Sequence, residues 1–100
     1  MYTAIRTYTT SDAKEVKRLV EQEFVPMVKD LPGFIGYYVV DAGNGKFATI
    51  TVCDEREDVE ESTKRAAGWV QDRLSSLITS GPEVLMGDTV VSETAARVTT

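Results

Sequence analysis

The chain is divided at Leu31-Pro32-Gly33-Phe34-Ile35-Gly36-Tyr37-Tyr38-Val39-Val40, where one helix ends and one strand begins. Pro32-Gly33 cannot continue a helix, because proline lacks the N–H that a helical turn needs. The aromatic and β-branched residues that follow predict a strand over Phe34–Asp41. Adjacent strand residues alternate between faces, so Tyr37 and Tyr38 are expected on opposite sides of the sheet.

A helix is predicted immediately before this stretch. From Val16 to Leu31, apolar residues recur at spacings of three and four and form one stripe. The residues over 9–12 offer side chains that can cap the N-terminus of this helix. Pro26 lies inside the pattern, so we expect a kink or a break near Val25.

Three further strands and a second helix are predicted. The first strand is expected over Tyr2–Tyr8, and the Gly43-Asn44-Gly45 turn predicts a hairpin that returns over Phe47–Cys53. The second helix is predicted over 57–78, with Asp54 as an acidic cap. Ser80-Gly81-Pro82 is expected to end that segment. The last strand is then predicted over Glu83–Ser92.

The element order β-α-β-β-α-β predicts a ferredoxin-like α+β fold, with a four-stranded antiparallel sheet and two helices on one face. We expect one domain over residues 1–92 and a flexible tail over 93–100. Along the strand over Phe34–Asp41, the residues that point to either face of the sheet are apolar or aromatic. A sheet face in contact with water is polar instead. A second copy is expected to cover that face, giving a homodimer packed sheet to sheet.

Charge and composition exclude several classes of function. The chain has 100 residues with 11 basic and 16 acidic side chains, a net charge of −5. This negative balance argues against nucleic acid and anionic membrane surfaces as partners. The sequence has no apolar run long enough to cross a membrane and no visible signal peptide, so a cytoplasmic protein is expected.

Metal and cofactor chemistry is also disfavoured. The chain has no histidine and one cysteine, Cys53, so it lacks the commonest transition-metal ligand and any internal disulfide. Cys53 is interpreted as a packing residue, with a redox role before a helix N-terminus as the alternative. The acidic residues over 55–61 suit the positive end of a helix dipole. Because they spread around the helix, no metal site is predicted, and no cofactor is expected.

Four residues are candidates for a ligand pocket, namely Arg6, Tyr37, Tyr38 and Trp69. If the face that carries Arg6 is buried, its guanidinium needs a carboxylate or an anionic ligand. The carboxylates considered as structural partners are Asp41, Glu83 and Asp88. A tyrosine hydroxyl could orient a substrate and Trp69 could stack on one, but each ring could equally be a packing residue.

The stretch over 31–40 resembles the end of the first helix and the second strand of dimeric α+β-barrel proteins, which include antibiotic biosynthesis monooxygenase-like domains. Pro32-Gly33-Phe34 followed by Gly36-Tyr37 carries the resemblance, which extends in order and length over Tyr2–Val91. It implies the same fold and a homodimer. Members that act as enzymes are often cofactor-independent oxygenases or bind haem, and others, such as stress-responsive barrel proteins, are similar in fold.

The functional residues of the haem-degrading members are not carried by this chain. Their Asn position falls near Ile5, their Trp position near Ser62 or Thr63, and their His position near Trp69 or beyond it. Two hypotheses therefore remain. The first is a cofactor-independent monooxygenase whose small aromatic or polyketide-like substrate, as an anion, itself reduces dioxygen. The second is a non-catalytic dimer that binds a small hydrophobic ligand or a protein partner.

Overall fold

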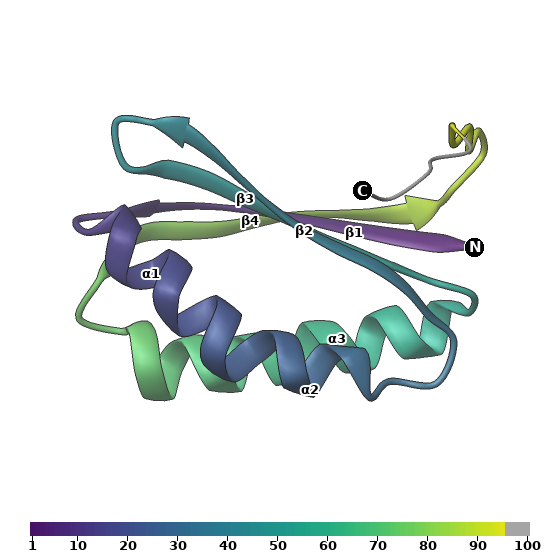
Figure 1. Cartoon of the computed structure of the whole chain (residues 1–100), viewed down its shortest axis with the longest axis horizontal. Coiled ribbons are helices and arrows are strands. Elements are labelled where there is room, and N and C mark those ends of the chain that lie inside the picture. The colour runs from purple at the N-terminus through teal and green to yellow at the C-terminus, as the bar shows by residue number, and fades with distance from the viewer. Residues whose placement is uncertain (96–100) are drawn as a thin grey trace.

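The computed structural model describes residues 1–95 and shows one antiparallel sheet with every helix on the same face (Figure 1). The strands lie in the order β2-β3-β1-β4. Their bounds are β1 Tyr2–Thr10, β2 Phe34–Gly43, β3 Lys46–Cys53 and β4 Ile78–Asp88. The predicted ferredoxin-like α+β fold is confirmed. Of the predicted tail over 93–100, residues 96–100 lie outside the described part of the chain.

Each of the two long helical segments contains a π-helical stretch. The first runs through α1 (Ala13–Leu19), η1 (Val20–Phe24) and α2 (Val25–Lys29), and the second through α3 (Arg56–Trp69) and η2 (Val70–Leu74). In the first segment the Val25 N–H donates to the carbonyl of Val20, five residues earlier. Pro26 follows directly and has no N–H to donate. A kink or a break was predicted near Val25, and the structure instead has a widened turn within a helix that continues through Pro26.

The boundary between the second helix and the last strand differs from the prediction. The helix ends at Leu74, and Ile78 already belongs to β4. Ser80-Gly81-Pro82 lies inside the strand, where the pairing with β1 shifts register and Gly81 has a φ of +103°. An edge strand tolerates proline because one side of it has no ladder hydrogen bonds to lose. The strand ends at Asp88, four residues before the predicted end at Ser92.

The predicted acidic cap of the second helix is also wrong. Glu55 occupies the N-cap position, and its side chain makes no capping hydrogen bond. Asp54 instead donates its backbone N–H to the carbonyl of Gly33, which ties the helix start to the turn before β2. By contrast, Asp12 caps α1 through a bond from the Glu15 N–H to its carboxylate. This agrees with the caps predicted over 9–12.

The main core lies between the sheet and the helices. Side chains from β1 and β3 alternate toward it, and Tyr8 stacks on Phe47 with ring centroids 5.0 Å apart. Phe24 is buried among them and comes from η1. Apolar burial of this kind stabilises the fold by about 25 cal/mol for each Å² removed from water.

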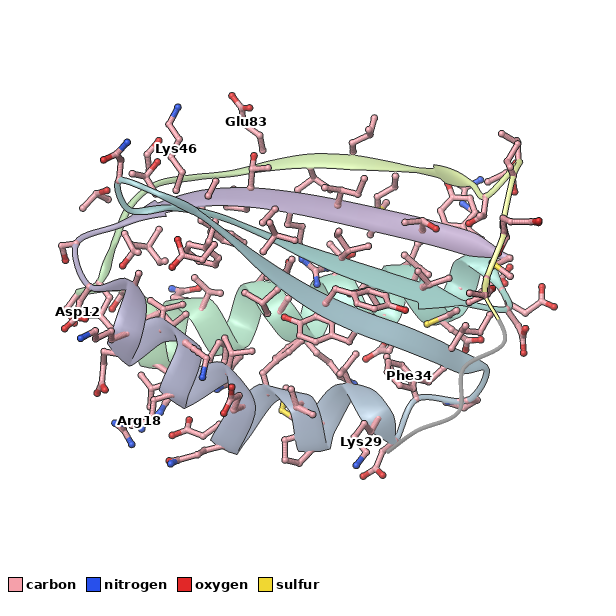
Figure 2. All side chains as sticks on the ribbon, turned by 45° about the horizontal axis from the view of Figure 1, so that its top comes forward. Asp12, Arg18, Lys29, Phe34, Lys46 and Glu83 are labelled. Carbon is pink, nitrogen blue, oxygen red and sulfur yellow. The ribbon has the colours of Figure 1, made fainter. Side chains whose placement is uncertain are left out.

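The opposite side of the sheet, here called the outer face, has no covering element within residues 1–95 (Figure 1). Register places these side chains on it: Ile5, Tyr38, Val40, Ala48, Ile50, Val52 and Leu85. Leu85 is 69% exposed and Tyr38 57% exposed. Charged side chains lie toward one end of this face, where Figure 2 shows Lys46 and Glu83 pointing away from the helices. No described helix is both long enough and apolar enough to span a bilayer.

Candidate functional site

A small cavity lies in the core, between the middle of the sheet and the two π-helical stretches. Its walls combine aliphatic side chains with five aromatic ones, Tyr8, Phe24, Tyr37, Phe47 and Trp69. Its volume is about 10 Å³, room for about one water molecule. A cavity of this volume cannot hold an aromatic ring, so a ligand of that size needs the walls to move.

Arg6 forms the polar end of the cavity. It comes from the middle of β1, faces the helices and is 2% exposed. Its Nε donates to Thr49 Oγ1 at 3.3 Å, and its Nη2 donates to Thr51 Oγ1 at 3.0 Å. Its Nη1 donates to Thr63 Oγ1 of α3 at 3.1 Å. All three acceptors are neutral hydroxyls.

The structural ion pair considered for Arg6 does not form within the described residues. Asp41, Glu83 and Asp88 are all exposed, and none of them bonds to Arg6. Glu83 pairs with Thr7 and therefore belongs to the outer face, and Asp88 lies opposite Tyr2 at the far end of β1. The guanidinium is thus held by hydroxyls and carries its charge without a carboxylate from the described chain.

The two adjacent tyrosines separate as the strand alternation predicts. Tyr37 lines the cavity, and burial raises the pKa of its hydroxyl to about 12, although the nearby Arg6 charge opposes that rise. Tyr38 does not reach the cavity, because it lies on the outer face. Its ring covers Gly36, where an added Cβ would come within 3.0 Å of the Tyr38 hydroxyl. Tyr38 is therefore removed from the candidate pocket.

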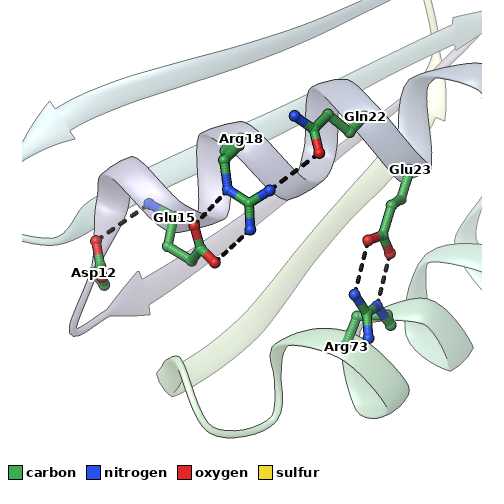
Figure 3. A network of polar contacts seen from close by, with 6 residues as sticks. All are labelled: Asp12, Glu15, Arg18, Gln22, Glu23 and Arg73. Carbon is green, nitrogen blue, oxygen red and sulfur yellow. Dashed lines mark hydrogen bonds and ion pairs between the residues drawn. The ribbon is translucent and has the colours of Figure 1, made fainter.

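Trp69 lies at the end of α3 and connects the cavity wall to the surface. Its ring packs on Phe24 with centroids 5.4 Å apart, and its Nε1 donates to Glu23 Oε1 at 3.2 Å. The same carboxylate accepts two bonds from Arg73, at 2.7 and 2.8 Å (Figure 3). These bonds, from Arg73 first and then Trp69, hold the pKa of Glu23 below its usual value. We call these three residues the Glu23–Trp69–Arg73 cluster.

The Glu23–Trp69–Arg73 cluster joins the two π-helical stretches on the solvent side of the cavity. Glu23 belongs to η1 and Arg73 to η2, and both charged ends are partly exposed. The same stretches contribute further wall residues, Val20 from η1 and Val70 and Leu74 from η2. π-helical turns occur frequently at functional sites. Two of them on one cavity mark it as the candidate site.

The sequence interpretation missed most of the polar surroundings. Thr49 and Thr51 share the parity of Phe47 on β3, and that alternation was the available signal for a polar patch on the core face. Thr63 lies within the second helix, predicted over 57–78, four residues after the buried Val59. Nothing in the sequence pairs Glu23 with Arg73, because the two residues belong to different helical segments and meet only in the folded chain.

The remaining candidates carry no chemistry at this site. Cys53 is fully buried beside Ala4 and Val59, and burial together with nearby Asp58 and Asp54 raises the pKa of its thiol. Its packing interpretation therefore fits better than a redox role. Within residues 1–95, no three metal-binding side chains of the Cys, Asp, Glu or His type come together to form a site.

Neither a family model nor a curated protein matches the chain in sequence. Solved structures match it in fold. A protein of unknown function from Nitrosomonas europaea (NE2512) superposes with a TM-score of 0.80 at 9% identity, over 96% of this chain and 95% of that one. A candidate antibiotic biosynthesis monooxygenase from the same organism gives 0.73 at 12%, over 91% and 100%.

A third structure is SnoaB, a cofactor-independent oxygenase from Streptomyces nogalater. It superposes with a TM-score of 0.69 at 15% identity, over 91% of this chain and 94% of that one. Identities this low establish the fold alone. This chain therefore has the α+β fold of antibiotic biosynthesis monooxygenase-like proteins.

Proposed function

We propose that this protein is a homodimer whose cavity binds a small aromatic molecule and oxygenates it without a cofactor. The observation that carries the proposal is a small cavity with five aromatic side chains and the buried Arg6 in its wall. Ligand sites are mostly apolar, with a few polar groups that fix orientation. The fold shared with SnoaB, described as a cofactor-independent oxygenase, supports the reaction class.

The chemistry needs no group beyond the substrate and dioxygen. A phenol that loses its proton becomes an electron-rich anion and can reduce dioxygen itself. One oxygen atom then forms a new C=O on the ring, and the other leaves as water with the O–H hydrogen and one ring hydrogen. The phenol becomes a quinone, and the four electrons that it loses reduce dioxygen fully.

Three residues receive roles in this scheme. Arg6 stabilises the phenolate oxygen, because its charge lies in a buried site where electrostatic interactions are stronger than in water. Tyr37 keeps its proton, since its pKa is raised to about 12, and can donate a hydrogen bond to an oxygen of the substrate. Trp69 stacks on the ring of the substrate.

The dimer is proposed from the outer face. Leu85, Tyr38 and Val40 are all exposed there, on two different strands. A continuous apolar surface of this kind marks an association site. Two copies related by a two-fold axis would each bury the same residues, as isologous dimers do.

A non-catalytic binding protein is the second candidate. The cavity of about 10 Å³ favours it, because a working oxygenase must admit both a ring and dioxygen. The absence of histidine also removes the commonest general base.

Native mass spectrometry and an absorbance spectrum of the freshly purified protein make the first test. A dimer with a bound aromatic mass supports the pocket, and a monomer contradicts the dimer. Oxygen consumption with a panel of naphthols and dihydroxynaphthalenes then separates the two candidates. Trp69→Phe should lower turnover with little change in melting temperature. If no phenol in the panel drives oxygen uptake, the oxygenase is rejected in favour of the binding protein.

A further inference from the structure

We propose that Arg6 is an anion receptor, and that the ligand of the cavity is an aromatic monoanion whose charged oxygen group binds to that guanidinium. This deepens the proposed function and rests on its premise that the cavity takes an aromatic molecule. It adds a required charge to the ligand, in the enzymatic and the non-catalytic case alike. Three independent features of the site support it.

The first feature is how the described chain places its carboxylates. Four arginines pair with glutamates at exposed positions, namely Arg18, Arg56, Arg65 and Arg73. Arg6 is buried, and its partners within residues 1–95 are neutral hydroxyls of threonines and tyrosines. An isolated buried charge is costly unless an opposite charge compensates it. Within the described residues, the exposed arginines therefore have carboxylate partners, although a surface ion pair stabilises little. The buried Arg6, for which a negative partner would matter most, is left to a ligand.

The second feature is that the neighbouring tyrosines cannot supply the negative charge. Tyr8 and Tyr37 both lie near Arg6 and line the same cavity. Burial raises the pKa of both hydroxyls, more strongly than the Arg6 charge lowers it. Both phenols therefore stay protonated at neutral pH. They surround the guanidinium as neutral groups, as the three threonines do.

The third feature is the number of donors that remain. A guanidinium has five N–H donors: one on Nε and two on each terminal nitrogen. The threonines take one donor from each of the three nitrogens, and the hydroxyls of Tyr8 and Tyr37 also hydrogen-bond to the guanidinium. A carboxylate or a phenolate oxygen would replace these two neutral hydroxyls as the acceptor of the remaining donors, and a charged acceptor forms the stronger bond. The guanidinium is thus oriented by the threonines, and an anion can take the place of the tyrosine hydroxyls.

Entry of such a ligand requires the cavity to open. A ring does not fit into about 10 Å³, and Trp69 in the cavity wall is held in place by its hydrogen bond to Glu23. Trp69 belongs to both the cluster and the cavity wall. Rotation of its ring would break one hydrogen bond to Glu23 and enlarge the cavity at the same time.

The test compares two probes of nearly equal shape, 2-naphthoate and 2-naphthamide, by isothermal titration calorimetry on the full chain. The wild type should bind the anionic naphthoate at least ten times more tightly than the neutral naphthamide. Arg6→Gln should abolish that preference, and Arg6→Lys should retain part of it, because the lysine keeps the charge. Arg65→Gln, which removes a surface arginine paired with Glu61, should leave the preference unchanged.

Several outcomes would overturn the anion receptor. These are equal binding of the two probes, binding of neither probe by the wild type, or a preference that survives Arg6→Gln in protein with a native circular dichroism spectrum. If Arg6→Gln does not fold, the wild type and Arg6→Lys decide between the same outcomes. Turnover is not measured in this experiment. If the protein prefers naphthoate but consumes no oxygen, the anion receptor is supported and the oxygenase is rejected. If it consumes oxygen but shows no preference for naphthoate, the oxygenase is supported and the anion receptor is rejected.

Discussion

Each face of the sheet departs in part from the pattern expected of a half-buried sheet. The face toward the helices buries Arg6, Thr49 and Thr51, whereas the outer face exposes Leu85 and Tyr38. A sheet that belongs to a monomer places apolar residues inside and polar residues outside. The buried polar residues belong to the proposed ligand site, and the exposed apolar residues belong to the proposed dimer interface. In these two proposals, one sheet serves both purposes through the alternation of its side chains.

The largest expected effect on stability comes from a substitution in the core between the helices and the sheet. Phe24→Ala removes a buried ring that packs on Tyr37 and Trp69. It should lower the free energy of unfolding by about 3–5 kcal/mol, as aromatic-to-alanine changes in cores do. Urea denaturation at fixed protein concentration measures this. Val84→Ala, at a half-exposed position, should cost about 0.5 kcal/mol or less. Similar losses for both variants would show that Phe24 is not a core residue.

The next effect tests the outer face. Leu85→Asp places a charge on the apolar surface, on the edge strand β4 and opposite Ile5. Because both copies would carry the change, dimerisation should weaken by about 2–4 kcal/mol, a factor of roughly thirty or more in the dissociation constant. Sedimentation equilibrium measures that constant. Gln71→Asp, exposed on η2, is the matched control and should leave it unchanged. Unaltered association of Leu85→Asp would place the dimer interface elsewhere.

A smaller effect compares one threonine from each face of the sheet. Thr51→Val keeps the shape of the side chain but removes an acceptor of Arg6, and should cost about 1–2 kcal/mol. Thr7→Val makes the same chemical change at an exposed position of β1 and should cost less than about 0.5 kcal/mol. Thermal and chemical unfolding measure the two differences. Equal values would mean that the buried hydroxyl does not support the guanidinium.

The smallest effect is a pH dependence at the Glu23–Trp69–Arg73 cluster. The Arg73 bonds, with smaller contributions from Trp69 and the Arg18 charge, lower the pKa of Glu23 below its ordinary value of 4.5. The contact is therefore complete above that value and is lost as the pH falls through the lower, folded-state pKa. The emission of Trp69, the single tryptophan, should change in that acidic range while the far-ultraviolet spectrum stays native.

Glu23→Gln is the control for this titration. The glutamine still accepts a bond from the Trp69 indole but has no proton to gain in the acidic range. The emission change should therefore disappear in this variant. A change of equal size in Glu23→Gln would assign the titration to another group.

The sequence predicts the fold well and the site only in part. The Pro32-Gly33 break and the Gly43-Asn44-Gly45 turn are local signals, and both lie where the structure has a turn. The end of the second helix was mistaken because Leu77 and Ile78 continue the helical spacing, although Ile78 pairs with Thr10 in the sheet. Local periodicity cannot distinguish these cases, because long-range pairing decides between them.

Among the pocket candidates, strand alternation established that Tyr37 and Tyr38 diverge, but not which of them faces inward. That choice depends on the register between β2 and β3, which places Tyr37 opposite Thr51 and Tyr38 opposite Ile50. Arg6 and Trp69 lie in the cavity wall. Their functional roles stay predictions, which the binding and turnover experiments above address.

The two π-helical stretches are places where each helix can lose a residue. A π-helical turn contains more residues than an α-helical turn, so η1 and η2 each hold an extra residue within a continuous helix. Deleting one residue from η1 would therefore restore a regular α-helix, and the residues on either side of the deletion would keep the faces that they have now. Each helix thus differs from a regular α-helix by one residue, and a change in length at this point leaves the rest of the core in place.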